Sequence, residues 1–280
     1  MPLKLTRTIG QSEATIAIFG PKDAREHYLG SWSLSPLQKN CAPDAKGEHE
    51  RLTHGVGRTL RSLGVQTAYA PRVGPASAKI VESWQLQECI PLGNVKLFRQ
   101  HNLDADGVFL DEGEAFVMSA AGCPVIIASG GEHFVAAHAA RDSLIDRLFI
   151  SGMRSRAFVS IVDFIVNRFR ARDISPRDIS MVMLFSIAPE NFEHSPTHPT
   201  HGTYNRALIA IADSQWPGSI IRRNGSTYLN LEQVFVSQAH TAGVRKVWVE
   251  HTLDSHPGFV QTSVGDNKGK RNLVVVKRSS

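Results

Sequence analysis

Two residues of the sequence, Cys123 and His138, have the types and the spacing to carry out chemistry together. A cysteine at the lip of a strand acts as a nucleophile or as a metal ligand when its thiolate form is favoured. Gly122 before it permits a sharp turn, and Pro124 after it opens an apolar run. His138 ends a short apolar segment, where proteins often place functional side chains. The alternative for each residue alone is a structural role in the core.

The segment between the two residues predicts how they meet. Residues 124–128 and 133–138 are apolar runs typical of strands, and a Gly-Gly pair between them predicts a tight turn. The chain therefore leaves one sheet edge and returns to it, which brings Cys123 and His138 together. This arrangement suits either a Cys–His catalytic dyad or two of the ligands of a zinc ion.

The rest of the sequence predicts strands and helices that are mixed along the chain. Apolar patterns and turn residues indicate strands at 13–20, 106–118 (with a turn inside), 179–188, 244–250 and 272–276, and helices at 48–63, 143–169 and 229–243. There is no regular β-α-β rhythm, no Gly-rich phosphate loop, no internal repeat and no linker. We therefore expect one domain over residues 1–280, of the α+β class, built as a layered sandwich with mixed β-sheets.

The composition is that of an ordinary folded protein. The 280 residues are 42% hydrophobic and 20% charged, with a net charge of +5. The basic residues are scattered and no nucleic-acid recognition motif accompanies them, so we expect a solvated basic face and no specific nucleic-acid partner.

The cysteines and the apolar runs indicate the cellular compartment of the protein. Cys41, Cys89 and Cys123 form no CxxC pair, which excludes a zinc ribbon and a thioredoxin-like site. Unpaired cysteines suit a reducing compartment. The first twenty residues lack the apolar core of a signal peptide, and no apolar run approaches the roughly 20 residues that a membrane span needs. We expect a cytoplasmic protein without a membrane partner.

Several segments resemble the laccase-domain family, which is also called multicopper polyphenol oxidoreductase and, more recently, purine nucleoside phosphorylase. They read D-A-D-G-V-F-L at 104–110, S-A-A-G-C-P-V at 119–125 and V-A-A-H-A-A-R at 135–141. They are similar to the family's Asp-Ala strand start, its T-A-D-C-x-P-V turn and its A-A-x-H-A-G-W-R-G turn. Further likeness follows at 185–193, 229–244 and 269–276. The resemblance covers most of the chain and is thin before residue 50.

The resemblance implies a metal-dependent enzyme of purine nucleosides. The family binds a metal, usually zinc, through two His and one Cys, and is associated with phosphorolysis of adenosine and related nucleosides and with adenosine deamination. The matching ligands here are Cys123 and His138, with zinc, or copper, as the implied cofactor. Such a site leaves a fourth position where the metal activates water or polarises a bound oxygen. The implied small-molecule substrates are a purine nucleoside and phosphate.

The sequence departs from the family pattern at several motif positions. Arg72-Val73-Gly74-Pro75 stands where the family has Q-V-H-G, so its first His ligand is missing there. Gly122 stands in place of the Asp before the Cys, and only Arg141 remains of the W-R-G turn. His251 stands at the family's late Cys-Thr motif. His101 and His251 are the candidate replacement ligands.

These comparisons give the candidate site residues. Cys123, His138 and Arg141 are the candidate catalytic residues, and Lys22, Arg72 and Arg141 are candidate cations for a phosphate. A second, local idea concerns the loop EHSPTHPTHG, whose ligand-like residues are His194, His198 and His201. Such a loop is either a metal site or a solvated insertion.

Three functions from different classes remain. The first choice is a metal-dependent purine nucleoside phosphorylase or adenosine deaminase-type enzyme, a transferase or hydrolase. The second is a metal-free cysteine hydrolase or deamidase, because the fold is also similar to the bacterial cytotoxic necrotizing factor catalytic domain and the chemoreceptor glutamine deamidases, which use a Cys nucleophile and a His base. The Gly122-Cys123 pair resembles the toxin's S-G-C turn. The third is a non-catalytic relative that keeps the scaffold.

Overall fold

The computed structural model of the chain describes residues 2–21, 34, 46–73, 78–100, 102–150, 152, 159–250 and 271–279. Within these ranges, none of the helices has both the length and the apolar character that a membrane crossing requires.

Two large β-sheets form the centre of the molecule. The first has the order β1 (Leu3–Ile9), β2 (Ser12–Phe19), β15 (Asn272–Ser279), β8 (Ala115–Ala120), β3 (Thr67–Tyr69), β6 (Val95–Arg99) and β5 (Glu88–Leu92). The second has the order β14 (Lys246–Glu250), β11 (Ser180–Leu184), β9 (Val125–Gly130), β10 (His133–His138), β7 (Gly107–Phe109) and β4 (Ile80–Val81). Both are mixed, because β3 runs parallel to β6 and β8, and β11 runs parallel to β14.

Six α-helices and a small hairpin complete the described fold. The helices are α1 (Lys46–Ser62), α2 (Arg141–Leu144), α3 (Arg147–Ile150), α4 (Ile161–Arg170), α5 (Gly202–Gln215) and α6 (Leu231–Thr241). The hairpin consists of β12 (Ile220–Arg223) and β13 (Ser226–Leu229). Short 3-10 turns lie at Ser83–Gln85, Pro176–Asp178 and Pro189–Asn191.

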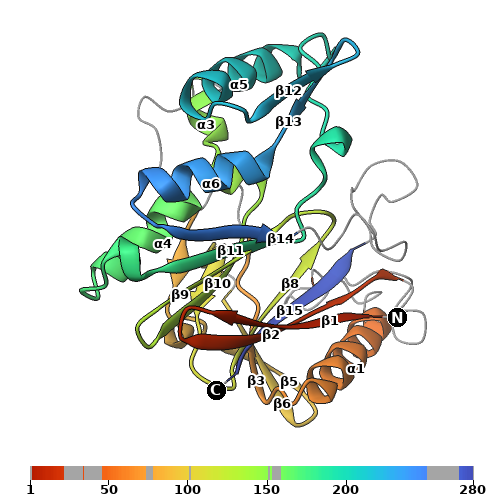
Figure 1. Cartoon of the computed structure of the whole chain (residues 1–280). Helices are drawn as coiled ribbons and strands as arrows, with labels where there is room; N and C mark the ends of the chain where they lie inside the picture. Colours follow the sequence, from red (N-terminus) through yellow and green to blue (C-terminus); the bar gives the residue numbers. More distant parts are fainter. Residues whose placement is uncertain are drawn as a thin grey trace.

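The two sheets pack face to face, and helices cover their outer faces (Figure 1). The core between the sheets joins residues of the first, such as Ile16, Phe116 and Val276, to Ile127 and Phe134 of the second. Burial of these apolar side chains is the main force that holds the two sheets together. Helices α4 and α6 cover the second sheet, whereas α1 covers the first. The predicted layered α+β fold with mixed sheets is therefore confirmed.

The helices that cover the second sheet have clear boundary signals. Ser160 caps α4, since its Oγ accepts a hydrogen bond from the backbone N–H of Asp163 at 3.1 Å. Asn230 caps α6 through Gln233 in the same way. Gly243, with φ of +95°, follows the end of α6. These short-range signals fix the start of both helices and the end of α6 in the sequence.

Beyond α6, a smaller lobe is built from α3, α5 and the β12–β13 hairpin (Figure 1). Leu208 and Ala212 of α5 and Leu229 of β13 are buried in the same apolar cluster as α4 and α6. The lobe therefore continues the helical layer outward from the second sheet.

Most predicted elements around the site are confirmed, but one prediction was wrong. The strands expected at 124–128 and 133–138 and the helices expected at 48–63 and 229–243 are present within a few residues. The single helix expected at 143–169 is not. Helix α2 ends at Leu144, because Ile145 has extended backbone angles, and α4 begins only after Ser160.

Candidate active site

Three neighbouring strands bring the candidate residues to one edge of the second sheet. Strand β10 lies between β9 and β7, with His138 opposite Val125 and Ala137 opposite Gly107. Cys123 lies two positions before the first residue of β9, and Asp106 lies directly before β7. The pairing of these strands with β10 therefore brings both residues close to His138. The predicted meeting of Cys123 and His138 is confirmed, and an acidic residue joins them.

Asp106 and His138 form a buried hydrogen-bonded pair. The Nδ1 atom of His138 lies 3.1 Å from Oδ1 of Asp106. Their side chains are 10% and 1% exposed, respectively. A carboxylate only accepts hydrogen bonds, so Nδ1 carries the proton and donates it. The backbone holds the same pair in place, since the N–H of His138 donates to the carbonyl oxygen of Asp106 at 2.8 Å.

The turn before β9 aims Cys123 at this imidazole. Gly122 has φ of +81°, a left-handed conformation that glycine adopts without strain. The carbonyl oxygen of Pro124 accepts a hydrogen bond from the N–H of Ala139 at 2.9 Å, which ties the turn to the end of β10. The half-buried thiol of Cys123 is hydrogen-bonded with His138. Because Nδ1 is taken by Asp106, Nε2 is the nitrogen left for the thiol.

The surroundings of Cys123 favour its thiolate. Burial disfavours the charged form and acts to raise the pKa of the thiol. The hydrogen bond and the charge of His138 act in the opposite direction and outweigh burial, with a smaller contribution from Arg271. The pKa of Cys123 is therefore lowered from its ordinary value, as in cysteines that act as nucleophiles.

The same contacts favour the protonated form of His138. Burial alone lowers the pKa of an imidazole, but the hydrogen bonds with Asp106 and with Cys123 raise it to about 10. The two shifts describe one coupled thiolate–imidazolium pair. Asp106, His138 and Cys123 thus have the order of an orienting carboxylate, a base and a nucleophile.

Gly107 allows the carboxylate to reach this position. A Cβ atom on Gly107 would lie 2.5 Å from Cβ of Ala137 and 2.6 Å from the carbonyl oxygen of Ala136. Strand β7 can therefore lie in this register beside β10 only without a side chain at this point. The close approach of the two strands fixes the distance between Asp106 and His138.

Arg141 lies in a neighbouring cavity of about 370 Å³. Its Nε donates to Asp142 at 2.9 Å and its Nη1 lies 3.2 Å from Nε2 of His194. The guanidinium also lies over the ring of Tyr204, 5.4 Å from the ring centroid. The structure therefore joins the candidate cation Arg141 to the histidine loop. No contact between Arg141 and Cys123 is present among the described residues.

The histidines of the loop make separate contacts. The two ring nitrogens of His194 contact the carbonyl oxygen of Phe192 and the guanidinium of Arg141. Nδ1 of His198 accepts from the backbone N–H groups of Thr200 and His201. Among the described residues these three histidines are not gathered into a group that could hold a metal ion, and metal binding by this loop stays a prediction.

The zinc ligands implied by the resemblance are only partly described. A zinc site takes at least three protein ligands. Among the described residues, no group of three His, Cys, Asp or Glu side chains is arranged to hold a metal ion. Cys123 and His138 are together, whereas His101 and His251 lie outside the described residues. The described residues alone therefore do not supply a zinc site, and zinc or copper stays a prediction.

The candidate phosphate cations are dispersed. Nε of Arg72 lies 3.3 Å from Oδ1 of Asp104 in an exposed ion pair. Lys22 lies outside the described residues.

Asp106 is the site residue that the sequence interpretation did not single out. It lies inside the segment D-A-D-G-V-F-L, directly before a strand. An acidic residue directly before a predicted strand, next to a predicted Cys–His pair, is the signal that could have identified it.

Comparisons with known proteins identify solved structures that have a similar fold. No family model and no curated protein matches the sequence. Three solved structures are similar over nearly the whole chain. Protein NMB0706 of Neisseria meningitidis, described by the family model DUF152, is 14% identical with a TM-score of 0.60 and covers 99% of both chains. The hypothetical protein YfiH of Bacillus licheniformis is 14% identical with a TM-score of 0.63, over 95% of this chain and 92% of its own. YlmD of Geobacillus stearothermophilus is 16% identical with a TM-score of 0.58, over 100% of this chain and 92% of its own.

The chain has the laccase-domain fold of these three proteins. The resemblance stated from residues 104–142 is thereby confirmed at the level of the fold. The laccase-domain fold places the strand ends that carry Asp106, Cys123 and His138 at one sheet edge. At this level of identity the comparison defines the scaffold, and the chemistry follows from the site residues of this chain.

Proposed function

We propose that the chain is a cysteine-dependent hydrolase that removes an amino group from a planar carbon and releases ammonia. Cys123 is the nucleophile, His138 exchanges the proton, and Asp106 positions the imidazole. The observation that carries this proposal is the buried Asp106–His138 hydrogen bond beside the His138–Cys123 contact. This order of carboxylate, imidazole and nucleophile is the arrangement that activates cysteine and serine in hydrolases on unrelated folds.

The reaction proceeds in two halves. In the first, the thiolate of Cys123 attacks the carbon that bears the amino group, and a carbon–sulfur bond forms. The imidazolium of His138 gives its proton to the departing nitrogen, the carbon–nitrogen bond breaks, and ammonia leaves. In the second half, water attacks the same carbon while neutral His138 takes its proton. The carbon–sulfur bond then breaks and the thiolate is restored, so the net change is amine plus water to oxygenated product plus ammonia.

Two substrate classes contain such a carbon. The laccase-domain resemblance points to the 6-amino group of a purine nucleoside such as adenosine. The likeness to the deamidases points to the side-chain amide of glutamine. Both reactions use the same residues in the same roles, and adenosine is the first substrate to test because the resemblance covers most of the chain.

A second candidate is zinc-dependent phosphorolysis of a purine nucleoside, which the resemblance also implies. The cavity that contains Arg141 supports it, because a guanidinium is a suitable partner for phosphate. Phosphorolysis breaks the bond between the ribose and the base and transfers the ribose to phosphate. In that reaction Cys123 is a metal ligand and not a nucleophile, so the two candidates differ in their products and in their need for phosphate and metal.

One assay separates the candidates. Purified protein is incubated with adenosine, with and without phosphate and a metal chelator, and the products are identified by chromatography. Inosine and ammonia are expected from the parent protein and from the control Cys89→Ala, whose thiol is exposed on β5. Neither product is expected from Cys123→Ala.

The other outcomes decide between the remaining functions. Adenine and ribose 1-phosphate, formed only with phosphate and lost with the chelator, would establish the second candidate. Ammonia from glutamine peptides instead of adenosine would keep the hydrolase and change its substrate. No turnover of either substrate would overturn the hydrolase and leave the non-catalytic relative.

A further inference from the structure

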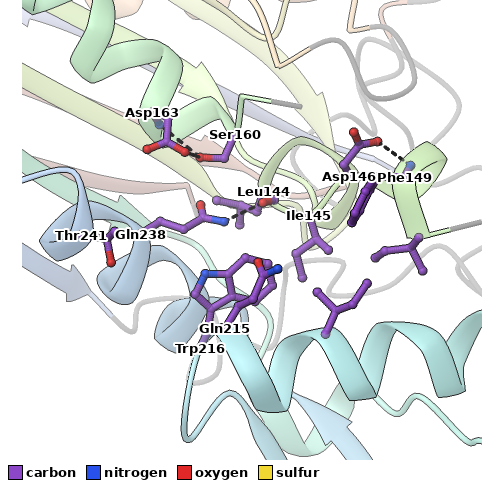
Figure 2. A pocket seen from close by; sticks show the side chains of 12 residues that line it. Leu144, Ile145, Asp146, Phe149, Ser160, Asp163, Gln215, Trp216, Gln238 and Thr241 are labelled. Carbon is purple, nitrogen blue, oxygen red and sulfur yellow. Dashed lines mark hydrogen bonds between the residues drawn. The ribbon is translucent and has the colours of Figure 1, made fainter. Parts of the chain in front are cut away.

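A second cavity, of about 350 Å³, lies where the outer lobe meets the helices that cover the second sheet (Figure 2). Its walls come from α2, α3, α4, α5 and α6 and from the residues that join them. Its volume is in the range of small-molecule sites in proteins. The proposed catalytic residues do not line it, so it is a feature separate from the proposed function.

Most of the cavity wall is apolar and partly aromatic. Leu144 and Ile145 are buried in it, and Phe149 and Trp216 line it with half-buried rings. Figure 2 shows the indole of Trp216 facing the cavity from the end of α5. Such rings pack against flat apolar groups and attract cations to their faces.

Gln238 carries, in this wall, an acceptor atom that no described residue satisfies. The residue is 6% exposed, and its Nε2 donates to the carbonyl oxygen of Leu144 at 2.7 Å (Figure 2). Its Oε1 atom is buried and has no hydrogen-bond partner among the described residues. A buried oxygen without a donor is costly, and native proteins rarely leave one in place without a reason. A ligand that donates a hydrogen bond at this point satisfies it.

The charge of the lining selects the kind of donor. Asp146 and Asp163 line the cavity, and none of the described residues in its wall is Lys, Arg or His. Asp146 is 5% exposed, and its Oδ1 accepts a hydrogen bond from the backbone N–H of Phe149 at 3.1 Å. The charge of these described wall residues disfavours carboxylates and phosphates and favours cations.

We propose that this cavity binds a small organic amine with a ring-bearing apolar body. An N–H group of the ligand donates to Oε1 of Gln238, and its positive charge is stabilised by Asp146 and Asp163. Its ring packs against Trp216 and Phe149. Each part of the ligand thus matches a described feature of the wall.

The test uses phenethylamine as the probe, with 2-phenylethanol and 3-phenylpropionate as matched neutral and anionic compounds. Isothermal titration measures the affinity of the purified protein for each. We expect saturable binding of phenethylamine, at least about tenfold weaker binding of the alcohol, and none of the acid. Equal affinity for all three compounds, or no saturable binding of the amine at millimolar concentration, would overturn the proposal.

Two variants on the same helix test the role of Gln238. Gln238→Met keeps the length of the side chain but cannot accept from the ligand, so phenethylamine affinity should fall about tenfold. Gln233→Met on the same helix is the control and should leave the affinity unchanged. Unchanged affinity in Gln238→Met would contradict the proposal.

A measurement on the unaltered protein covers the case in which Gln238→Met does not fold. Nuclear Overhauser effects between the ring protons of phenethylamine and the indole of Trp216 are expected, and their absence at saturation would contradict the site. Cys123→Ala should bind the amine like the parent protein. The amine site and the proposed hydrolase therefore fail or succeed independently.

Discussion

Two buried histidines, His138 and His194, show opposite behaviour. Contacts with Asp106 and Cys123 raise the pKa of His138 to about 10. Burial, with the charge of Arg141 beside it, lowers the pKa of His194 to about 4, although a hydrogen bond to the carbonyl oxygen of Phe192 and the charge of Asp142 act the other way. Both residues are almost fully enclosed, being 8% and 3% exposed.

The difference shows that burial alone does not decide the protonation of a buried imidazole, because hydrogen-bond partners and neighbouring charges can outweigh it. Burial disfavours the charged form in both places. A carboxylate reverses that effect at His138, so this imidazole carries a proton that it can give away. A guanidinium adds to it at His194, so that imidazole stays neutral and acts as a structural acceptor. The first is suited to catalysis and the second to holding the loop against Arg141.

The largest expected effect comes from neutralising the carboxylate of Asp106, which His138 has as a partner and His194 lacks. Asp106→Asn keeps the size of the side chain but not its charge, so the pKa of His138 should fall and that of Cys123 should rise. Ammonia release should drop about 10⁴-fold, the loss seen when the carboxylate of such a triad is neutralised.

The pH dependence of Cys123 alkylation by iodoacetamide checks this expectation. In Asp106→Asn the alkylation profile should move to higher pH, which a purely structural role of Asp106 would not cause. Asp104→Asn is the matched control, because Asp104 is exposed and pairs with Arg72. An unchanged profile in Asp106→Asn would mean that the carboxylate does not stabilise the thiolate–imidazolium form of Cys123 and His138.

Acid should destabilise the fold through His194. In the unfolded chain its pKa is about 6.5, and in the folded chain it is about 4. Between these values the unfolded chain binds more protons, so the free energy of unfolding falls as the pH is lowered through this window. The loss should be roughly 3 kcal/mol and complete below pH 4.

Urea unfolding at pH 7.5 and at pH 4.5 measures the loss. His194→Gln removes the titrating group and should show a smaller difference between the two pH values. His198→Gln, at an exposed position in the same loop, should behave like the parent protein. A parent protein with equal stability at both pH values would contradict the assignment.

A third change moves the carboxylate without altering its chemistry. Gly107→Ala puts a methyl group against Ala137 and the backbone of β10, which should lower the free energy of unfolding by about 1–3 kcal/mol. The displaced Asp106 should also slow Cys123 alkylation at pH 6. Gly113→Asn is the control, because Gly113 has open space around it and Asn tolerates its φ of +82°. Wild-type stability of Gly107→Ala would show that β7 shifts freely.

The smallest effect concerns the guanidinium. Arg141→Gln removes the positive charge next to His194, so the pKa of His194 should rise, by less than about one unit, or 1.4 kcal/mol. It should stay below 6.5, because burial is the largest cause of its shift. NMR titration of the ring protons measures this. Arg206→Gln should have no effect, since Arg206 bonds to Pro196 and Thr203 instead.

The sequence predicted the part of the site that is local in the chain. Cys123 and His138 are separated by one strand, one turn and another strand, and that pattern alone implies their meeting. Asp106 joins them through the pairing of β7 with β10, a register that local patterns do not encode. The same reason explains why the amine cavity, which gathers residues from five helices, had no signal in the sequence.

The elements that were not predicted are short or have ambiguous apolar patterns. Strands β1 and β3 to β6, helix α5 and the β12–β13 hairpin were not predicted. Apolar residues at helical spacing between 143 and 169 suggested one helix, but they belong to the separate helices α2, α3 and α4, which pack on one apolar cluster. Residues that pack on one cluster from several short elements can show the apolar spacing of a single helix.

The position of β15 has a consequence for how the protein is made. This strand lies between β2 and β8, where Val276 pairs with Ile16 on one side and with Phe116 on the other. During synthesis, the ribosome has released β2 and β8 long before residues 272–279 emerge. The two strands then present unpaired edges, which are prone to aggregation. The first sheet closes only when this late segment inserts between them, so folding of the core has to wait for it.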